Sequence, residues 1–219
     1  MKEIKRGLFF VFEGIDGAGK STQAALLAAA LLKSGREVET YRDPGGTSLG
    51  ENVREMLLDK SAYPGMTPAA EALLYAAARA QLAADKIGPA LAMGRIVVGD
   101  RFGDSTIAYQ GFGRGLDVGL LTSVNDLATG GLTPDLTFLL DFPPELSKKR
   151  IVGEADRLEQ EKTSFFGRVR EGYLSLAKQR PGAYHVFDAS LNKEEIHCRV
   201  VDAIEVFTGE VFQRNLRAE

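Results

Sequence analysis

Gly14-Ile15-Asp16-Gly17-Ala18-Gly19-Lys20-Ser21 fits the pattern G-x-x-x-x-G-K-[ST], which is typical of a phosphate-binding loop. An apolar run at 8–12 precedes it and an alanine- and leucine-rich run at 23–32 follows it, so the loop is predicted to join a buried strand to a helix. In that setting backbone N–H groups and the helix N-terminus surround an anion. Lys20 is expected to contact the β- and γ-phosphates, and Ser21 to offer a hydroxyl to Mg²⁺. The sequence therefore predicts that a nucleoside triphosphate binds to Gly14, Ile15, Asp16, Gly17, Ala18, Gly19, Lys20, Ser21 and Thr22.

The composition narrows the class of protein. The chain has 219 residues, 44% of them hydrophobic, which suits a single domain over 1–219. Its net charge of −3 gives no indication of nucleic-acid binding. No run approaches the roughly 20 apolar residues of a membrane span, and a lone cysteine, Cys198, suits a reducing compartment. We expect a cytoplasmic protein that binds neither nucleic acid nor membrane.

Short β-rich runs alternate with longer helical patterns along the whole chain. This alternation predicts an α/β fold of the P-loop NTPase type, with a five-stranded parallel sheet and helices on both faces. Gly88-Pro89 is expected to interrupt the third helix or to end it. The expected strands are 8–13, 37–41, 95–100, 136–141 and 185–188, and the expected helices are 20–33, 49–58, 68–87, 117–129, 144–152, 163–179 and 193–206.

Polar residues follow several of these strands, where ligands bind to a parallel sheet. Asp100 and Arg101 follow the strand 95–100; an acid there is expected to organise Mg²⁺ and an arginine to hold phosphate. Arg42 opens the loop Arg42-Asp43-Pro44-Gly45-Gly46-Thr47 and is expected to meet a second anion, although the loop also fits a plain turn.

Two further patterns each have two interpretations. Tyr75 and Arg79 lie four residues apart on one helix face, so they fit either a base-binding pair or a core edge with a surface charge. The segment 148–159 is dense in charges of both signs and fits either a solvated surface or a small lid whose arginines fold over phosphates.

Over nearly its whole length the sequence resembles bacterial thymidylate kinases. The loop at 42–47 resembles R-E-P-G-G-T, residues 74–81 resemble L-F-A-A-D-R-A-Q, and residues 100–111 resemble D-R-Y-x-x-S-x-x-A-Y-Q-G. Phe12-Glu13 before the phosphate loop, Ser21-Thr22-Gln23 at its end, Pro134-Asp135-Leu136-Thr137 and Asp156-Arg157-Leu158-Glu159 fall at the expected places.

The resemblance implies an enzyme that transfers the γ-phosphoryl group of ATP to dTMP in dTTP synthesis, with Mg²⁺ as cofactor and as a homodimer paired through apolar helix faces. It implies a dTMP site in which the base stacks on Tyr75 and accepts a hydrogen bond from Arg79. In that site Thr106 lies along the base edge, Tyr109 crowds the 2′ position of the sugar, Asp16 meets the 3′ hydroxyl, and Arg42, Arg101 and Ser105 complete the set.

The resemblance also implies catalytic and metal-binding groups. Gly17 stands where some relatives carry an arginine, so the transition-state arginine is expected from the lid, as Arg150 or Arg157, although Arg157 could instead pair with Glu154 or Glu161. The expected catalytic set is Lys20, Arg101, Arg150, Arg157 and Asp16. The expected metal-binding set is Ser21, Asp100 and Glu159, with sugar binding as the alternative role of Glu159.

Three residues depart from the family pattern: Tyr75 replaces Phe, Asp43 replaces Glu, and Ala78 replaces an acid, which removes an orienting partner expected for Arg79 or Arg101. One alternative function is another nucleoside or nucleotide kinase on the same scaffold. A P-loop GTPase switch is a second alternative, because residues 43–46 fit D-x-x-G; residues 192–195 fit N-K-x-D except that Glu195 replaces the guanine-selective Asp.

Overall fold

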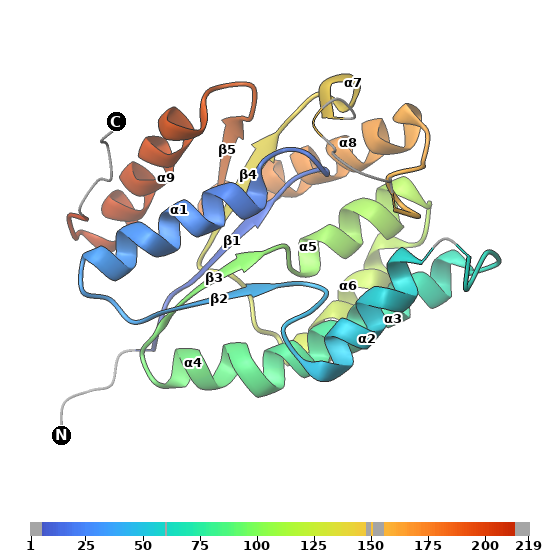
Figure 1. The fold of residues 1–219 in the computed structure, drawn as a ribbon, viewed down its shortest axis with the longest axis horizontal. Helices are drawn as coiled ribbons and strands as arrows, with labels where there is room; N and C mark the ends of the chain where they lie inside the picture. The colour runs from blue at the N-terminus through green and yellow to red at the C-terminus, as the bar shows by residue number, and fades with distance from the viewer. Residues whose placement is uncertain (1–5, 60, 148–149, 151–155, 213–219) are drawn as a thin grey trace.

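The computed structural model describes residues 6–59, 61–147, 150 and 156–212. These residues fold around a five-stranded, wholly parallel sheet with helices on both sides (Figure 1). The strand order is β2-β3-β1-β4-β5. The strands are β1 (Phe9–Glu13), β2 (Val38–Arg42), β3 (Ile96–Asp100), β4 (Leu136–Asp141) and β5 (Tyr184–Asp188).

The described helices lie close to their expected positions, except for α5 and η2, which the sequence analysis missed. They are α1 (Lys20–Lys33), α2 (Ser48–Leu58), α3 (Pro68–Leu82), η1 (Ala83–Ile87), α4 (Gly88–Ala92), α5 (Gly103–Thr106), η2 (Ile107–Gly113), α6 (Val118–Thr129), α7 (Pro144–Ser147), α8 (Thr163–Gln179) and α9 (Lys193–Thr208). The end of the helix expected at 144–152 lies mostly outside the described residues.

Local chemistry explains where these helices begin. Thr47, Thr67, Asp117 and Asn192 each accept a hydrogen bond from a backbone N–H in the first turn of the following helix. Asn192, the first residue of the stretch compared above with N-K-x-D, therefore acts as the cap of α9, accepting from the backbone of Glu195 at 2.7 Å. Helix capping therefore explains the presence of Asn192 without a GTPase motif.

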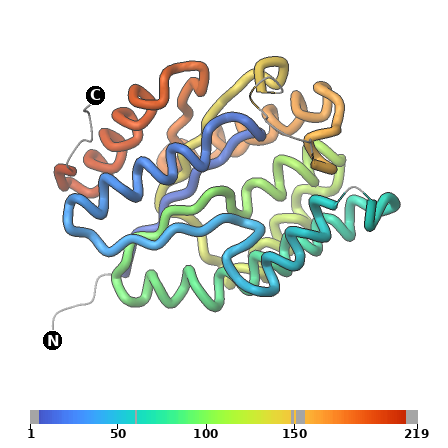
Figure 2. The backbone as a smooth tube through the Cα atoms, viewed as in Figure 1, coloured from blue at the N-terminus to red at the C-terminus, as the bar shows by residue number. Residues whose placement is uncertain are grey.

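The central strand β1 is fully buried because both sheet faces are covered. Phe9 and Val11 pack with residues of η1 and α4, whereas Phe10 and Phe12 belong to the larger core, which includes Leu27 of α1. Figure 1 shows α1 and α9 on one side of the sheet and α3, α4 and α6 on the other. Figure 2 shows α2 and α3 side by side, in the part of the chain that follows β2; these two helices pack against each other.

Two segments differ from the helices expected from sequence. Gly88-Pro89 does not end the third helix, but the α-helical pattern is interrupted next to it: the backbone widens into the π-helical turn η1 and continues as α4 to Ala92. The wider turn accommodates a proline, which has no N–H to donate and whose ring crowds the preceding turn. Residues 103–113, for which no helix was expected, form α5 and the π-helical η2, whose buried residues leave no polar face to give a helical pattern.

Candidate active site

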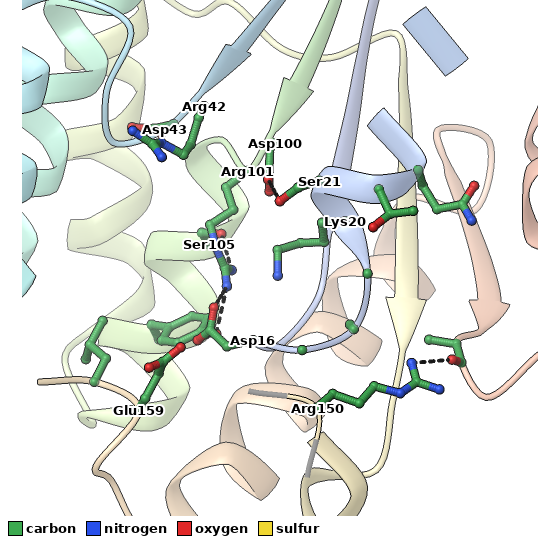
Figure 3. A pocket seen from close by; sticks show the side chains of 18 of the residues that line it. Asp16, Lys20, Ser21, Arg42, Asp43, Asp100, Arg101, Ser105, Arg150 and Glu159 are labelled. Carbon is green, nitrogen blue, oxygen red and sulfur yellow. Dashed lines mark hydrogen bonds and ion pairs between the residues drawn. The ribbon is translucent and has the colours of Figure 1, made fainter. Parts of the chain in front are cut away.

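A cavity of about 1120 Å³ opens where β1, β2 and β3 end. Its volume slightly exceeds the usual 300–1,000 Å³ of a single small-molecule site. Its walls come from the phosphate loop, the ends of β2 and β3, helices α2, α3, α5 and η2, the described part of 150–159, and the segment 189–196. Figure 3 shows the side chains that these elements direct into the cavity. The cavity is therefore large enough for two ligands side by side.

The phosphate loop has the expected geometry. Gly14, Gly17 and Gly19 have positive φ angles, and no side chain caps the α1 N-terminus that follows Gly19. A Cβ at Gly17 would lie 2.9 Å from the carbonyl oxygen of Ser147, so glycine is required by the close approach of α7. Lys20 is nearly buried and donates to the carbonyl of Ile15 at 2.9 Å. Burial, together with the nearby Arg101, lowers the pKa of Lys20 to about 8.

Ser21 and Asp100 meet beside this loop. The hydroxyl of Ser21 donates to the carboxylate of Asp100 at 2.5 Å, which places both oxygens in the cavity wall next to Lys20. Glu159, the third residue of the expected metal set, lies apart from this pair, beyond Asp16 (Figure 3). Among the described residues, no group of three or more His, Cys, Asp or Glu could hold a metal ion.

Arg101 occupies the centre of the cavity. Its φ angle of 71° makes it the one described non-glycine residue with a left-handed backbone, an uncommon conformation that is often found at functional sites. Its guanidinium pairs with Asp16 and donates to the hydroxyls of Tyr109 and Ser105 at 3.1 and 3.2 Å. Burial alone would raise the pKa of Asp16, but Arg101 and Lys20 outweigh it and lower that pKa to about 2. Asp16 is therefore ionised and fixes the guanidinium in one place.

Glu13 contacts Ser105 and Tyr173, two side chains that accept hydrogen bonds from Arg101. It was not named as a site residue in the sequence analysis. It is fully buried and accepts from the backbone of Phe102 at 2.9 Å, from Ser105 at 2.6 Å and from Tyr173 at 2.9 Å. Burial raises the pKa of Glu13 to about 7, although Arg101 opposes the rise. Its position at the end of a buried strand was the available signal, but Tyr173 lies 160 residues away and nothing local connects the two.

Arg79 is buried and held by three side chains. Its guanidinium donates to Asp43 at 2.6 Å, to Asn125 at 2.6 Å and to Thr106 at 2.9 Å. The expectation that Ala78 leaves Arg79 or Arg101 without an orienting acid was wrong, because Asp43 and Asp16 fill that role from distant loops. These contacts use three of the five N–H donors of a guanidinium, and Arg79 also lines the cavity.

Gln110 stands beside Arg79 and Thr106 in the same wall. It was not assigned a role from sequence. Its side-chain amide donates to Glu71 at 2.7 Å, so its carbonyl oxygen is the end directed away from Glu71. Tyr75, for which no side-chain hydrogen bond is observed among the described residues, also lines this part of the cavity.

Three arginines, from the end of β2, from α2 and from the residue after β3, line the same cavity. Arg42 lies at the end of β2 and pairs with the half-exposed Glu51 at 3.1 Å. Arg54 of α2, also missed from sequence, donates to the carbonyl of Pro44 at 3.3 Å, and burial together with Arg42 lowers its pKa. With Arg101 these side chains form a site suited to a second anion.

The two lid arginines point to different neighbours. Arg150 lines the cavity, lies 4.0 Å from the ring centre of Phe142 and donates to the carbonyl of Ala189 at 3.0 Å. Arg157 is not among the cavity-lining residues; it donates to the carbonyl of Leu57 at 2.9 Å and pairs with Glu71 at 2.6 Å. Residues 148–149 and 151–155 of the expected lid, including Glu154, lie outside the described residues.

A phosphate loop on a parallel sheet, with three arginines and the side chains of Tyr75 and Arg79 lining the same cavity, is the arrangement of a P-loop nucleotide kinase. Comparison with known proteins gives the family. A family model described as "Thymidylate kinase" matches residues 12–200. The chain belongs to the thymidylate kinase family and is an ATP-dependent nucleoside monophosphate kinase.

Individual relatives match along most of their length. A thymidylate kinase of Pelotomaculum thermopropionicum is 47% identical over 97% of this chain and 100% of its own. One of Desulforudis audaxviator is 56% identical over 84% and 83% of the two chains. The crystal structure of thymidylate kinase from Ehrlichia chaffeensis superposes with a TM-score of 0.73 at 35% identity, covering 91% of this chain and 99% of that one.

Proposed function

We propose that this enzyme transfers the γ-phosphoryl group of ATP to dTMP, giving dTDP and ADP, with Mg²⁺ as cofactor. The observation that carries the choice of dTMP is the pocket wall in which Arg79 offers hydrogen-bond donors and Gln110 is oriented as an acceptor. Thymine presents an acceptor at O4 beside a donor at N3, so it complements this pair. Adenine and cytosine carry an amino donor and a ring-nitrogen acceptor in the equivalent positions and do not.

In this proposal the triphosphate lies in the loop Gly14–Thr22, and its base lies toward 189–196, where Arg150 also reaches. The monophosphate of dTMP is held by Arg42, Arg54 and Arg101. An oxygen of that monophosphate attacks the γ-phosphorus while the bond to the β,γ-bridging oxygen breaks and ADP leaves with the electron pair. Because the second pKa of a phosphate ester is about 6, no strong general base is required.

We propose that Ser21 and Asp100 hold Mg²⁺, and their 2.5 Å contact, which places the two oxygens side by side, supports this assignment. A magnesium ion commonly takes one or two protein ligands and completes its shell with water and substrate phosphates, which fits this sparse donor set. When bound, the ion supplies positive charge to the phosphate oxygens. We assign Glu159 instead to the sugar of the acceptor, near Asp16 and Tyr109.

The hydrogen-bonding groups of Arg79 and Gln110 also determine which nucleoside monophosphates we expect as acceptors. We expect dTMP to have the highest kcat/KM and dUMP a value lower by roughly 10- to 200-fold, the effect of one missing methyl group in an apolar pocket. We expect dCMP to be poorer by roughly 10⁴-fold, because buried polar groups would be left unpaired. The ribose form of TMP should also be poorer because Tyr109 is fixed against Asp16 at 2.9 Å. A coupled ADP-release assay with these monophosphates and AMP measures the order, and equal values for dTMP, dCMP and AMP would contradict the proposal.

We retain 148–159 as the proposed lid, supported by the cavity-lining positions of Arg150, Asp156, Leu158 and Glu159. Replacing Arg150 by alanine is expected to lower kcat by about 10²-fold with little change in dTMP binding, as for a contact made mainly in the transition state. Replacing Arg157 is expected to lower the free energy of unfolding by about 2 kcal/mol instead, because it leaves buried Glu71 short of one partner.

Steady-state kinetics, direct dTMP titration and thermal unfolding of both variants separate these two outcomes. An unchanged kcat in both would place the transition-state cation elsewhere, with Arg101 the next residue to test. A large loss of kcat at normal stability in Arg157→Ala would instead assign that arginine to the phosphates.

We further propose that the enzyme is a cytoplasmic homodimer. Exposed leucines on α3 and α6, two helices that pack together, support a dimer surface: Leu73 is 58% exposed, Leu120 70% and Leu127 85%. In the described part of the chain, no helix is long and apolar enough to cross a membrane. The cytoplasmic assignment is supported by the lone cysteine, Cys198, which suits a reducing compartment.

A further inference from the structure

The amide group of Gln110 can face a ligand with either its NH₂ or its oxygen, and its neighbours decide which. A carboxamide carries a donor NH₂ and an acceptor oxygen of nearly equal size, so the partners of the group decide which end faces a ligand. Gln110 is 1% exposed and lines the cavity together with Tyr75, Arg79 and Thr106. Its NH₂ donates to Glu71 at 2.7 Å, which leaves the oxygen as the end available to a base.

Glu71 can impose this orientation because it is held as a carboxylate, which only accepts hydrogen bonds. It is 1% exposed, and Arg114 donates to both of its oxygens, at 3.3 and 3.2 Å. Arg157 adds an ion pair at 2.6 Å. Burial alone would raise the pKa of Glu71, but hydrogen bonds from Arg114 and Gln110 outweigh it and keep that pKa below its ordinary value.

Glu71 does not line the cavity, so it acts on a ligand only through the groups that it holds. If the Gln110 amide turned over, its NH₂ would face the base and its oxygen would face the Glu71 carboxylate, two acceptors in contact. That arrangement is costly inside a protein, where an unpaired acceptor loses its solvation. The carboxylate therefore selects one of two amide orientations.

We propose that Glu71 is a specificity-determining positioning residue, which fixes Gln110 as an acceptor and thereby selects a base with N–H at position 3, thymine or uracil, over cytosine. The inference rests on the proposed function, since it assumes that Gln110 faces the base of the acceptor nucleotide. The discrimination between the bases then depends on a charge that does not touch the substrate.

Glu71→Gln tests the inference, because an amide can donate as well as accept and so permits both orientations of Gln110. We expect the ratio of kcat/KM for dTMP to that for dCMP to fall about tenfold or more, while the ratio for dTMP to dUMP is retained. Both ratios are measured on one preparation, so a reduced folded fraction cancels. Glu71→Asp, which keeps the charge for Arg114 and Arg157 but withdraws it from Gln110, serves if Glu71→Gln does not fold and should shift the same ratio.

Two further variants make the result decisive. Glu161→Gln removes the other carboxylate paired with Arg114 without touching Gln110, and should leave the dTMP to dCMP ratio within about twofold of wild type, as for a partly exposed pair. Gln110→Met removes the acceptor itself and should lower the ratio at least as much as Glu71→Gln. If Gln110→Met leaves the dTMP to dCMP ratio unchanged, the proposal that Gln110 accepts a hydrogen bond from the base is contradicted. If Gln110→Met lowers the ratio but neither Glu71 variant changes it, the inference about Glu71 is wrong while the proposed function stands. The same conclusion follows if Glu161→Gln lowers the ratio as much as the Glu71 variants do.

Discussion

Arg101→Ala is expected to lower kcat/KM for dTMP by about 10³- to 10⁵-fold, the range seen when an arginine is removed from a phosphoryl-transfer site. Arg101 donates to the carbonyl of Gly14 in the phosphate loop at 3.0 Å and also belongs to the proposed monophosphate site, so it can neutralise charge on both nucleotides. Asp16 on one side and Tyr173, 3.1 Å away, on the other fix its guanidinium before substrate binds. This preorganisation is the physical reason for a large effect, since little reorientation is needed in the transition state.

Arg101→Lys is the matched control. It keeps the positive charge but loses the planar fork, so it should recover only part of the rate. Thermal unfolding of both variants is needed, because either change leaves Asp16 with a weaker partner. A loss below tenfold in a folded Arg101→Ala enzyme would show that Arg42 and Arg54 hold the acceptor phosphate without it.

Lys20→Ala is expected to lower kcat by about 10²- to 10³-fold, the effect of removing one preorganised group that stabilises charge in the transition state. Lys20 is nearly buried beneath the phosphate loop, where water screens its charge poorly. Lys33→Ala is the control, since it removes an exposed lysine from the last turn of the same helix and should leave kcat unchanged. A near-normal kcat for Lys20→Ala at saturating ATP and Mg²⁺ would contradict its assigned role.

The pH dependence gives a second readout for Lys20. Its pKa is lowered to about 8, so the ammonium is charged below that pH and increasingly neutral above it. Phosphates bind the charged form, so KM for ATP should rise in the wild type as the pH increases beyond about 8. Lys20→Ala has no group to titrate there and should lack this rise; an identical pH profile in both enzymes would assign the effect to another group.

The sequence by itself determined the features that depend on neighbouring residues. The phosphate loop, the buried strand before it and the bounds of α1 follow from glycine spacing and apolar runs within about 25 residues. The same local signals gave the parallel sheet and located Asp100 and Arg101 at the end of β3. Even there, local propensity misjudged Gly88-Pro89, because packing against β1 and β3 keeps the chain helical through a widened turn.

The tertiary structure alone decided how the site's charges are paired. Asp43 orients Arg79 from 36 residues away, Glu71 orients Gln110 from 39, and Tyr173 reaches Glu13 across 160. Arg150 and Arg157 are both arginines of the same charged segment, yet Arg157 pairs with Glu71 and does not line the cavity. The physical reason is that a buried charge takes as partner whichever group the strand order and helix packing bring within about 3 Å, and that distance is set by the fold and not by the spacing of residues along the chain.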